Sequence, residues 1–437
     1  MKLSRQVRMQ KSSQDALHAM RIEGRGASIS AGEKGEVRWK VKVVSYFMMV
    51  LFTALSLEVL SYAYLRVFEG YDGEHLMVYQ FDEYKNIRLT PNYHNSKGIY
   101  HNSQGFRRSA DIEKEKPKGT YRIFIMGGST AYGLYSMSRY GQERYSVITN
   151  HETIDYYLEQ YLSEKVPHKR IEVINAAITS HQSHHHLIYL NQTILKYMPD
   201  MVIFIDGFND YYPYKAGFDQ FRDYAYQERA HLFMGKPTIQ AWLGYTGWWL
   251  FRKSHFVHVA GKSLRPVWLL VSGVNRNRAR IDVEDGLRNL RINAEGNFVK
   301  MVERIGLMLK NEDVVPVFTL QPELVFRQSK VLTEMERDIL KEMETHWQEN
   351  YVEFKNKARE IVIDYLKRAS AKTGVLFFDL SNIYGGVEED VYTDYTHLTP
   401  IGNKILAEYL GARIVPIIQR SPVVDSPARH NIERTRS

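Results

Sequence analysis

The chain has 437 residues and an apolar fraction of 44%, enough for one large or two ordinary domains with a substantial core. It contains no cysteine, which excludes a disulfide framework, a thiol nucleophile and a thiolate metal site, and leaves the redox compartment open. The net charge of +8 suggests nucleic acid, but residues 1–42 alone hold ten Lys and Arg against four Asp and Glu. The basicity is therefore mainly a property of the N-terminal tail.

Residues 1–42 are polar and show no sustained periodicity, which predicts a disordered tail. Residues 43–65 are apolar, with Glu58 as their only charge, and are long enough for a helix to cross a hydrocarbon layer of roughly 30 Å. We interpret them as a transmembrane helix. The alternative is a buried amphipathic helix, which Glu58 favours because a carboxylate deep in lipid is costly.

The basic residues that abut this segment lie on its N-terminal side: Arg38, Lys40 and Lys42. The positive-inside rule therefore places the tail in the cytoplasm and the rest of the chain in the periplasm or outside the cell. A cleaved signal peptide is the alternative, since Ser61 and Ala63 offer a small-x-small site. Its N-terminal region would be unusually long, so an uncleaved anchor is favoured.

Residues 66–119 are expected to be a juxtamembrane connector that packs in part on the domain of residues 120–419. That domain opens with an apolar run that stops at Gly127-Gly128-Ser129-Thr130, and residues 138–162 are compatible with a helix. The pattern predicts a serine on a tight turn from strand to helix, where backbone N–H groups can stabilise negative charge. The phosphate-binding, dinucleotide-binding and Gly-x-Ser-x-Gly patterns are not matched. Taken alone, the motif also suits an ordinary structural turn.

A second strand at 170–174 runs into a small-residue loop that begins at Asn175. His181, His184 and His185 follow, and on a helix they would share one face, as metal ligands can. No carboxylate stands among them, so we favour a helix that begins beside the active site and predict neither a metal nor a cofactor.

A third strand at 201–205 ends in a loop that carries Asn209, which is either a turn residue or the donor of a side-chain N–H to an oxyanion. A later strand at 375–379 precedes Asp394 and His397, whose spacing lets both side chains project from one side of a loop. A carboxylate can then hold Nδ1–H of the imidazole while Nε2 faces a serine. Thr399 and Pro400 are expected to begin the last helix.

In chain order, Gly127-Gly128-Ser129, the Asn175 loop, Gly207-Phe208-Asn209-Asp210 and Asp394-x-x-His397 resemble the four blocks of the SGNH (GDSL) hydrolase superfamily, over about residues 120–210 and 296–415. The resemblance implies an α/β fold of three α/β/α layers around a parallel, flavodoxin-like sheet. It also implies Ser129 as nucleophile, His397 as general base, Asp394 as its orienting partner, and Asn209 with the Ser129 N–H as oxyanion donors.

Two positions depart from the superfamily pattern. Gly128 stands where the first block has Asp, which leaves the serine in place. The glycine of the second block, whose backbone N–H serves the oxyanion, aligns with Ser180 or, less well, with Ala177. A residue other than glycine still donates this N–H if its φ is allowed.

About residues 211–295 form an insertion that the fold does not require. It is rich in aromatic and basic residues: Trp242, Trp248, Trp249, Trp268, Arg252, Lys253, Lys262 and Arg265. The insertion suits a lid, a surface for an acyl chain or sugar, or a membrane contact. The alternative is a helical subdomain in which the aromatic residues form the core. A nucleic-acid partner is disfavoured by the expected location, and residues 420–437 are expected to form a flexible tail.

The sequence thus predicts a membrane-anchored serine ester hydrolase, outside the cytoplasm, that acts through an acyl-serine intermediate. The resemblance to bacterial relatives with an N-terminal anchor implies acyl or acetyl esters of envelope carbohydrate or lipid as substrates. One alternative is an O-acyltransferase with the same triad, and another is a catalytically silent protein that binds polysaccharide or lipid. The oligomeric state is not predicted.

Overall fold

The computed structural model describes residues 31–68, 77–82, 84–136, 138–145, 147–211, 246–247, 249–271, 279–280, 282–327, 331–346 and 348–421. The chain divides into two units, residues 1–63 and residues 64–437, and each is described by itself. The expectations for residues 1–30, for Trp242 and Trp248, and for the tail beyond residue 421 lie outside the described residues.

The predicted transmembrane segment lies within helix α2 (Ala31–Phe68), which extends beyond it at both ends. Among the described residues, the part from Arg38 to Phe68 is the one helix long and apolar enough to cross a membrane. Most of its large apolar side chains are exposed, as in a candidate membrane span. Residues 31–42 were expected to be disordered but are helical, because extending a formed helix costs far less than starting one.

The core of the second unit is a sheet of five parallel strands. In sheet order these are β4 (Arg170–Asn175), β3 (Thr120–Gly127), β5 (Met201–Asp206), β7 (Val315–Leu320) and β9 (Leu376–Asp379). Strands β3 and β5 are buried along their whole length, as expected when helices cover both faces of a parallel sheet. The predicted parallel α/β architecture is confirmed.

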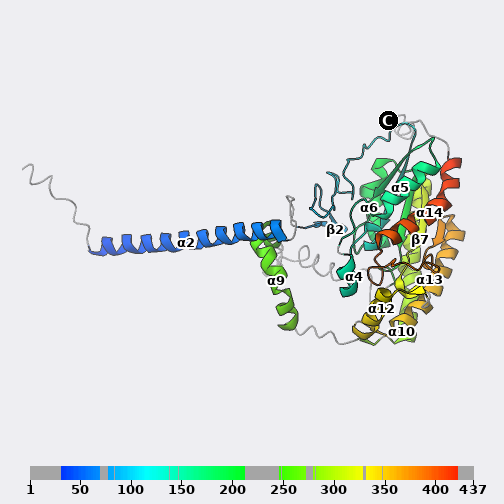
Figure 1. Ribbon diagram of the computed structural model, residues 1–437. Coiled ribbons are helices and arrows are strands. Elements are labelled where there is room, and N and C mark those ends of the chain that lie inside the picture. Colours follow the sequence, from blue (N-terminus) through cyan, green and yellow to red (C-terminus); the bar gives the residue numbers. More distant parts are fainter. Residues whose placement is uncertain are drawn as a thin grey trace, which may run out of the picture. The chain divides into compact units, whose positions relative to one another are not determined.

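Two groups of helices flank the sheet (Figure 1). One face is covered by α5 (Ile154–Lys165) and α14 (Pro400–Arg420), which pack against each other. The other face carries α6 (Ser183–Gln192), α11 (Lys300–Asn311) and α13 (Tyr351–Thr373). The result is the expected three-layer arrangement.

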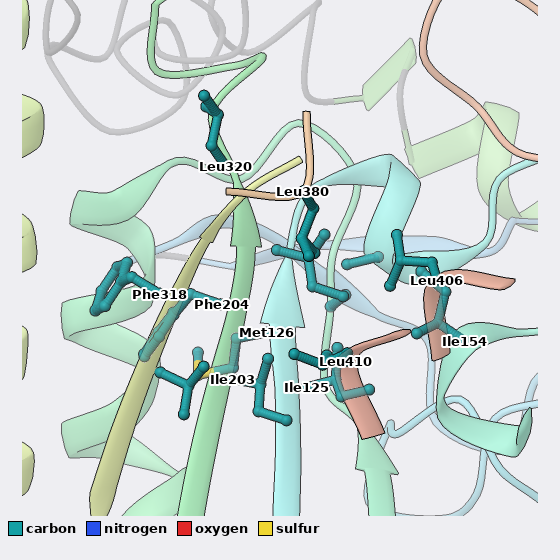
Figure 2. Packing of buried hydrophobic residues seen from close by; sticks show 14 of the residues in the cluster. Ile125, Met126, Ile154, Ile203, Phe204, Phe318, Leu320, Leu380, Leu406 and Leu410 are labelled. Carbon is teal, nitrogen blue, oxygen red and sulfur yellow. The ribbon is translucent and has the colours of Figure 1, made fainter. Parts of the chain in front are cut away.

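Figure 2 shows part of the packed core. Ile125 of β3 and Leu410 of α14 belong to one core cluster, and both are fully buried, as are Ile154 and Leu406. The rings of Phe204 and Phe318, from neighbouring strands, stack with their centroids 4.2 Å apart. This packing fixes the strands whose carboxyl ends carry the candidate site.

The remaining elements are short or lie outside the central sheet. They are β1 (Tyr79–Asp82), β2 (Asn86–Leu89), α3 (Ser129–Tyr132), α4 (Arg139–Arg144), η1 (Ile194–Tyr197), α9 (His255–Val271), β6 (Ala279–Arg280), α10 (Val283–Asn293), η2 (Ala294–Val299), η3 (Leu324–Phe326), α12 (Glu334–His346) and β8 (Gln348–Glu349). The described part of the insertion is mostly helical, as predicted, and also contains the short strand β6.

The helix-compatible stretch 138–162 is not continuous, since α4 and α5 are separated by a loop that contains Asn150. The Asn150 side chain accepts a hydrogen bond from Arg107, and this tertiary contact outweighs local helix preference. Arg107 belongs to the connector, is fully buried, and also donates to the carbonyls of Tyr132 and Gly133. The connector therefore supports the turn that carries Ser129.

Candidate active site

Two glycines make room for the turn that carries Ser129. Gly127 has a φ of 153°, and a Cβ there would collide with the carbonyl oxygen of Ile205. A Cβ on Gly128 would lie 2.5 Å from Nδ2 of Asn209. The chain thus leaves β3 and starts α3 at Ser129, which is half-buried. The tight turn from strand to helix is as predicted.

Ser129, His397 and Asp394 form a continuous chain of close polar contacts. Oγ of Ser129 lies 2.7 Å from Nε2 of His397, and Nδ1 of His397 lies 2.7 Å from Oδ2 of Asp394. With the proton of the neutral imidazole on Nδ1, His397 donates to Asp394 and Nε2 accepts from the serine hydroxyl. This is the geometry that base-activated nucleophilic attack requires.

Asp394 is fully buried and is held by its own loop. Its Oδ1 accepts the backbone N–H groups of Thr396 at 2.9 Å and His397 at 2.8 Å. Burial acts to raise the pKa of Asp394, but the charge and hydrogen bonds of His397 outweigh it and hold the pKa below its usual value. The carboxylate therefore stays ionised and orients the imidazole.

Three N–H donors are candidates for an oxyanion hole. Nδ2 of Asn209 donates one hydrogen to the His181 carbonyl at 2.9 Å, which leaves its second hydrogen for a ligand. Within the described residues, the backbone N–H groups of Ser129 and Ser180 donate to no protein acceptor. All three residues are half-buried and lie in the segments that follow the carboxyl ends of β3, β4 and β5.

Ser180 occupies a left-handed backbone conformation, with a φ of 63°. That conformation is normally the province of glycine, and for a serine it costs about 1–2 kcal/mol. A glycine would adopt this conformation without that cost.

A clamp between two loops holds the oxyanion side in place. Nε2 of Gln182 donates to the Asn209 carbonyl at 2.6 Å, and Nδ2 of Asn209 donates to the carbonyl of His181, the residue before Gln182. Beside it, the backbone N–H and the hydroxyl of Ser183 both donate to Oδ1 of Asp210, at 3.0 and 2.8 Å. Burial and the neighbouring Asp206 raise the pKa of Asp210 to about 7.

The histidines after Ser180 pack against one another beside the site. The rings of His181 and His185 stack with centroids 4.7 Å apart, and Nε2 of His181 lies 3.1 Å from the carbonyl of Ile87. Burial lowers the pKa of both rings well below its usual value. In the described part of the chain, no group of three or more His, Asp or Glu side chains is arranged to hold a metal ion. Helix α6 begins just after His181, at Ser183.

Sequence reasoning missed several supporting residues. Asn175 is a buried brace and no oxyanion donor, because its Nδ2 donates to Asp155 at 2.7 Å and to the Ala131 carbonyl at 3.2 Å. Burial raises the pKa of Asp155. Gln321, directly after β7, contacts both the Ser129 turn and the His397 loop. Asn175 is the last residue of β4 and Gln321 follows β7, so a polar residue at the end of an apolar run was the available signal in both cases.

Neither a protein-family model nor a curated protein matches this chain. Among solved structures it is similar to an acetylxylan esterase from Geobacillus stearothermophilus, with 12% identity, a TM-score of 0.33, and coverage of 68% of this chain and 94% of that one. It is also similar to an α/β hydrolase from the Lake Arreo metagenome, with 11% identity, a TM-score of 0.33, and coverage of 67% and 94%. A protein named as a GDSL-like lipase from Parabacteroides merdae shows 11% identity, a TM-score of 0.33, and coverage of 68% and 96%.

The chain's own geometry defines its class. It is a three-layer α/β/α protein in which a Ser-His-Asp arrangement lies at the carboxyl ends of parallel strands, next to three N–H donors. Ligands of such open sheets bind at this edge.

Proposed function

We propose that this protein is a serine ester hydrolase that acts through a covalent acyl-serine intermediate. The observation that carries the proposal is the unbroken contact from Ser129 through His397 to Asp394, with both distances at 2.7 Å. A serine hydroxyl is a weak nucleophile by itself, and a base within hydrogen-bond reach, oriented by a third group, is what activates it.

Each residue of the site has its own task in ester hydrolysis. Oγ of Ser129 attacks the ester carbonyl as its proton passes to Nε2 of His397, and Asp394 stabilises the imidazolium. The oxyanion accepts hydrogen bonds from the N–H groups of Ser129, Asn209 and Ser180. As the tetrahedral intermediate collapses, His397 returns the proton to the leaving alcohol. Water then attacks the acyl-serine by the same route, which releases the acid and restores the hydroxyl.

We further propose that the domain works outside the cytoplasm, on acyl or acetyl esters of envelope carbohydrate or lipid. The candidate span in α2 and the basic residues at its N-terminal end support this orientation. A reporter fused after Ser437 should then be active as an extracytoplasmic fusion. A cytoplasmic signal from the fusion would remove the basis for the envelope substrate.

The same triad would also transfer the acyl group to a sugar hydroxyl in place of water. Product analysis separates the two activities, since hydrolysis releases free acetate and transfer gives an acetylated acceptor. A silent binding protein has no need of an aligned triad, so the contacts of Ser129 favour an enzyme.

The test uses the full chain in detergent with a short acyl ester such as p-nitrophenyl acetate, with and without a sugar acceptor. The wild type should turn over and Ser129→Ala should not, whereas Ser163→Ala, at an exposed serine of α5, should match the wild type. Full turnover by Ser129→Ala would show that the serine assignment is wrong.

A further inference from the structure

The nucleophile and its base are 268 residues apart in the sequence, and they meet through the contact between Ser129 and His397. A 2.7 Å contact between two such elements needs something that fixes their relative position, because a displacement of about 1 Å can cost ~100-fold in rate. The structure offers one side chain from a third element that contacts both.

We propose that Gln321 is a positioning residue that aligns Ser129 with His397; the inference rests on the proposed hydrolase function. Gln321 directly follows β7 and is almost fully buried. Its Nε2 donates to Oγ1 of Thr396 at 2.7 Å and to Oγ1 of Thr130 at 3.2 Å. Thr130 is the residue after the nucleophile, and Thr396 is the residue before the base.

The two threonines complete a closed network. Oγ1 of Thr130 donates to the Thr396 carbonyl at 3.2 Å, so the two loops also touch each other directly. The backbone N–H of Thr396 donates to Asp394, which links the network to the orienting carboxylate. Gln321 thus acts on the loop that sets both the position and the tilt of the imidazole.

The backbone of Gln321 is itself fixed. Its N–H donates to the Asp206 carbonyl at 2.8 Å, and Asp206 ends the strand that leads to Asn209. The preceding carbonyl, of Leu320, accepts from Leu380, which follows β9. Gln321 is therefore a fixed point of the sheet, and the amide transfers that fixed position to two loops. Replacing this buried amide by an apolar side chain removes the donor from the hydroxyls of Thr130 and Thr396, which costs free energy.

The test compares Gln321→Leu, Thr396→Val and Thr319→Val in the full chain. Thr319 is a matched control, because it lies two residues earlier, within β7, is equally buried, and donates to the Phe204 carbonyl. We expect Gln321→Leu to lower kcat by roughly 10- to 100-fold with KM within about 2-fold, since misalignment affects the transition state and not ground-state binding. Thr319→Val should lower the melting temperature and leave kcat at the wild-type value.

Two further results make the role of Gln321 specific. The double variant Gln321→Leu/Thr396→Val should be no slower than the worse single variant, because both changes break the same contact, the one between Gln321 and Thr396. Thr396→Ser keeps the hydroxyl and should recover most of the activity that Thr396→Val loses.

The rate of labelling by a fluorophosphonate probe separates failure of this inference from failure of the proposed function. An unlabelled wild type would contradict the hydrolase proposal itself. A wild type that is labelled, with Gln321→Leu labelled just as fast and merely less stable, would show that Gln321 is structural only. Slow labelling of a Gln321→Leu protein that is folded at the assay temperature is the expected result.

Discussion

The two halves of the candidate site are built in different ways. The base side is local: Asp394 accepts backbone N–H groups from the next turn of its own loop, and the Thr393 N–H donates to the His397 carbonyl at 2.8 Å. The oxyanion side is assembled from two distant loops, which Gln182 and Asn209 cross-link. Substitutions on the base side should therefore reduce activity mainly by removing a reacting group. Substitutions on the oxyanion side should also reduce it by displacing the remaining N–H donors.

The largest expected effect comes from His397→Ala. Removing the base should lower kcat for a short acyl ester by roughly 10⁴- to 10⁶-fold, because nucleophile and base act as one unit. Asp394→Ala should also be severe but less complete. His168→Ala, at an exposed histidine, is the control and should match the wild type. A His397→Ala enzyme with more than a tenth of wild-type turnover would contradict the assigned role.

Asn209→Ala tests the oxyanion side. We expect kcat to fall by roughly 10²- to 10³-fold with little change in KM, because an oxyanion donor acts mainly in the transition state. Asn191→Ala, at an exposed position of α6, should have no effect on either constant. A change in KM alone would make Asn209 a substrate-binding or purely structural residue.

Asp210→Asn tests the oxyanion side through the pH dependence of its stability. The folded-state pKa of Asp210 is raised from 3.8 to about 7, so between these values the folded protein keeps a proton that the unfolded chain has lost. The stability contributed by this proton is fully present below about pH 4 and is lost as pH rises to about 7. Asn keeps the acceptor for Ser183 and carries no charge.

The melting temperature of Asp210→Asn relative to the wild type should therefore increase between about pH 4 and pH 7 and stay level above it. Thermal melts at matched ionic strength measure this difference. A difference that does not change with pH would show that Asp210 has an ordinary pKa and that the clamp does not titrate.

The smallest expected effect is that of Ser180→Gly. If the donor is the backbone N–H, glycine should keep kcat within about 3-fold, since it adopts a φ of 63° without strain. Ser180→Val should lower both the melting temperature and kcat, because a β-branched residue is disfavoured at positive φ. Loss of activity in Ser180→Gly would instead assign a role to the serine hydroxyl.

The sequence predicted what is local and periodic. Four of the five strands of the central sheet were marked by a short apolar run, the Ser129 turn by adjacent glycines, and the last helix by Thr399 and Pro400, whose cap the structure contains. The close approach of Asp394 to His397 also follows from their spacing.

The remaining features depend on tertiary contacts that no local pattern encodes. Gln321 lies 191 residues from Thr130 along the chain, and no spacing rule joins them. Residues 333–370 carry a helical pattern in the sequence, but they form two helices, α12 and α13, which are separated by β8 and by Asn350 at a φ of 67°. Strand β8 pairs with β6 of the insertion, and that long-range pairing is what interrupts the helical pattern.

Covalent labelling measures directly whether Ser129 is an activated nucleophile. The full chain would be treated with a fluorophosphonate, digested, and the modified residue located by mass spectrometry, with His397→Ala as the matched variant. We expect a single adduct on Ser129 that forms rapidly in the wild type and at least 100-fold more slowly in His397→Ala. No adduct, an adduct on another serine, or labelling of Ser129 at the same rate without His397 would contradict it.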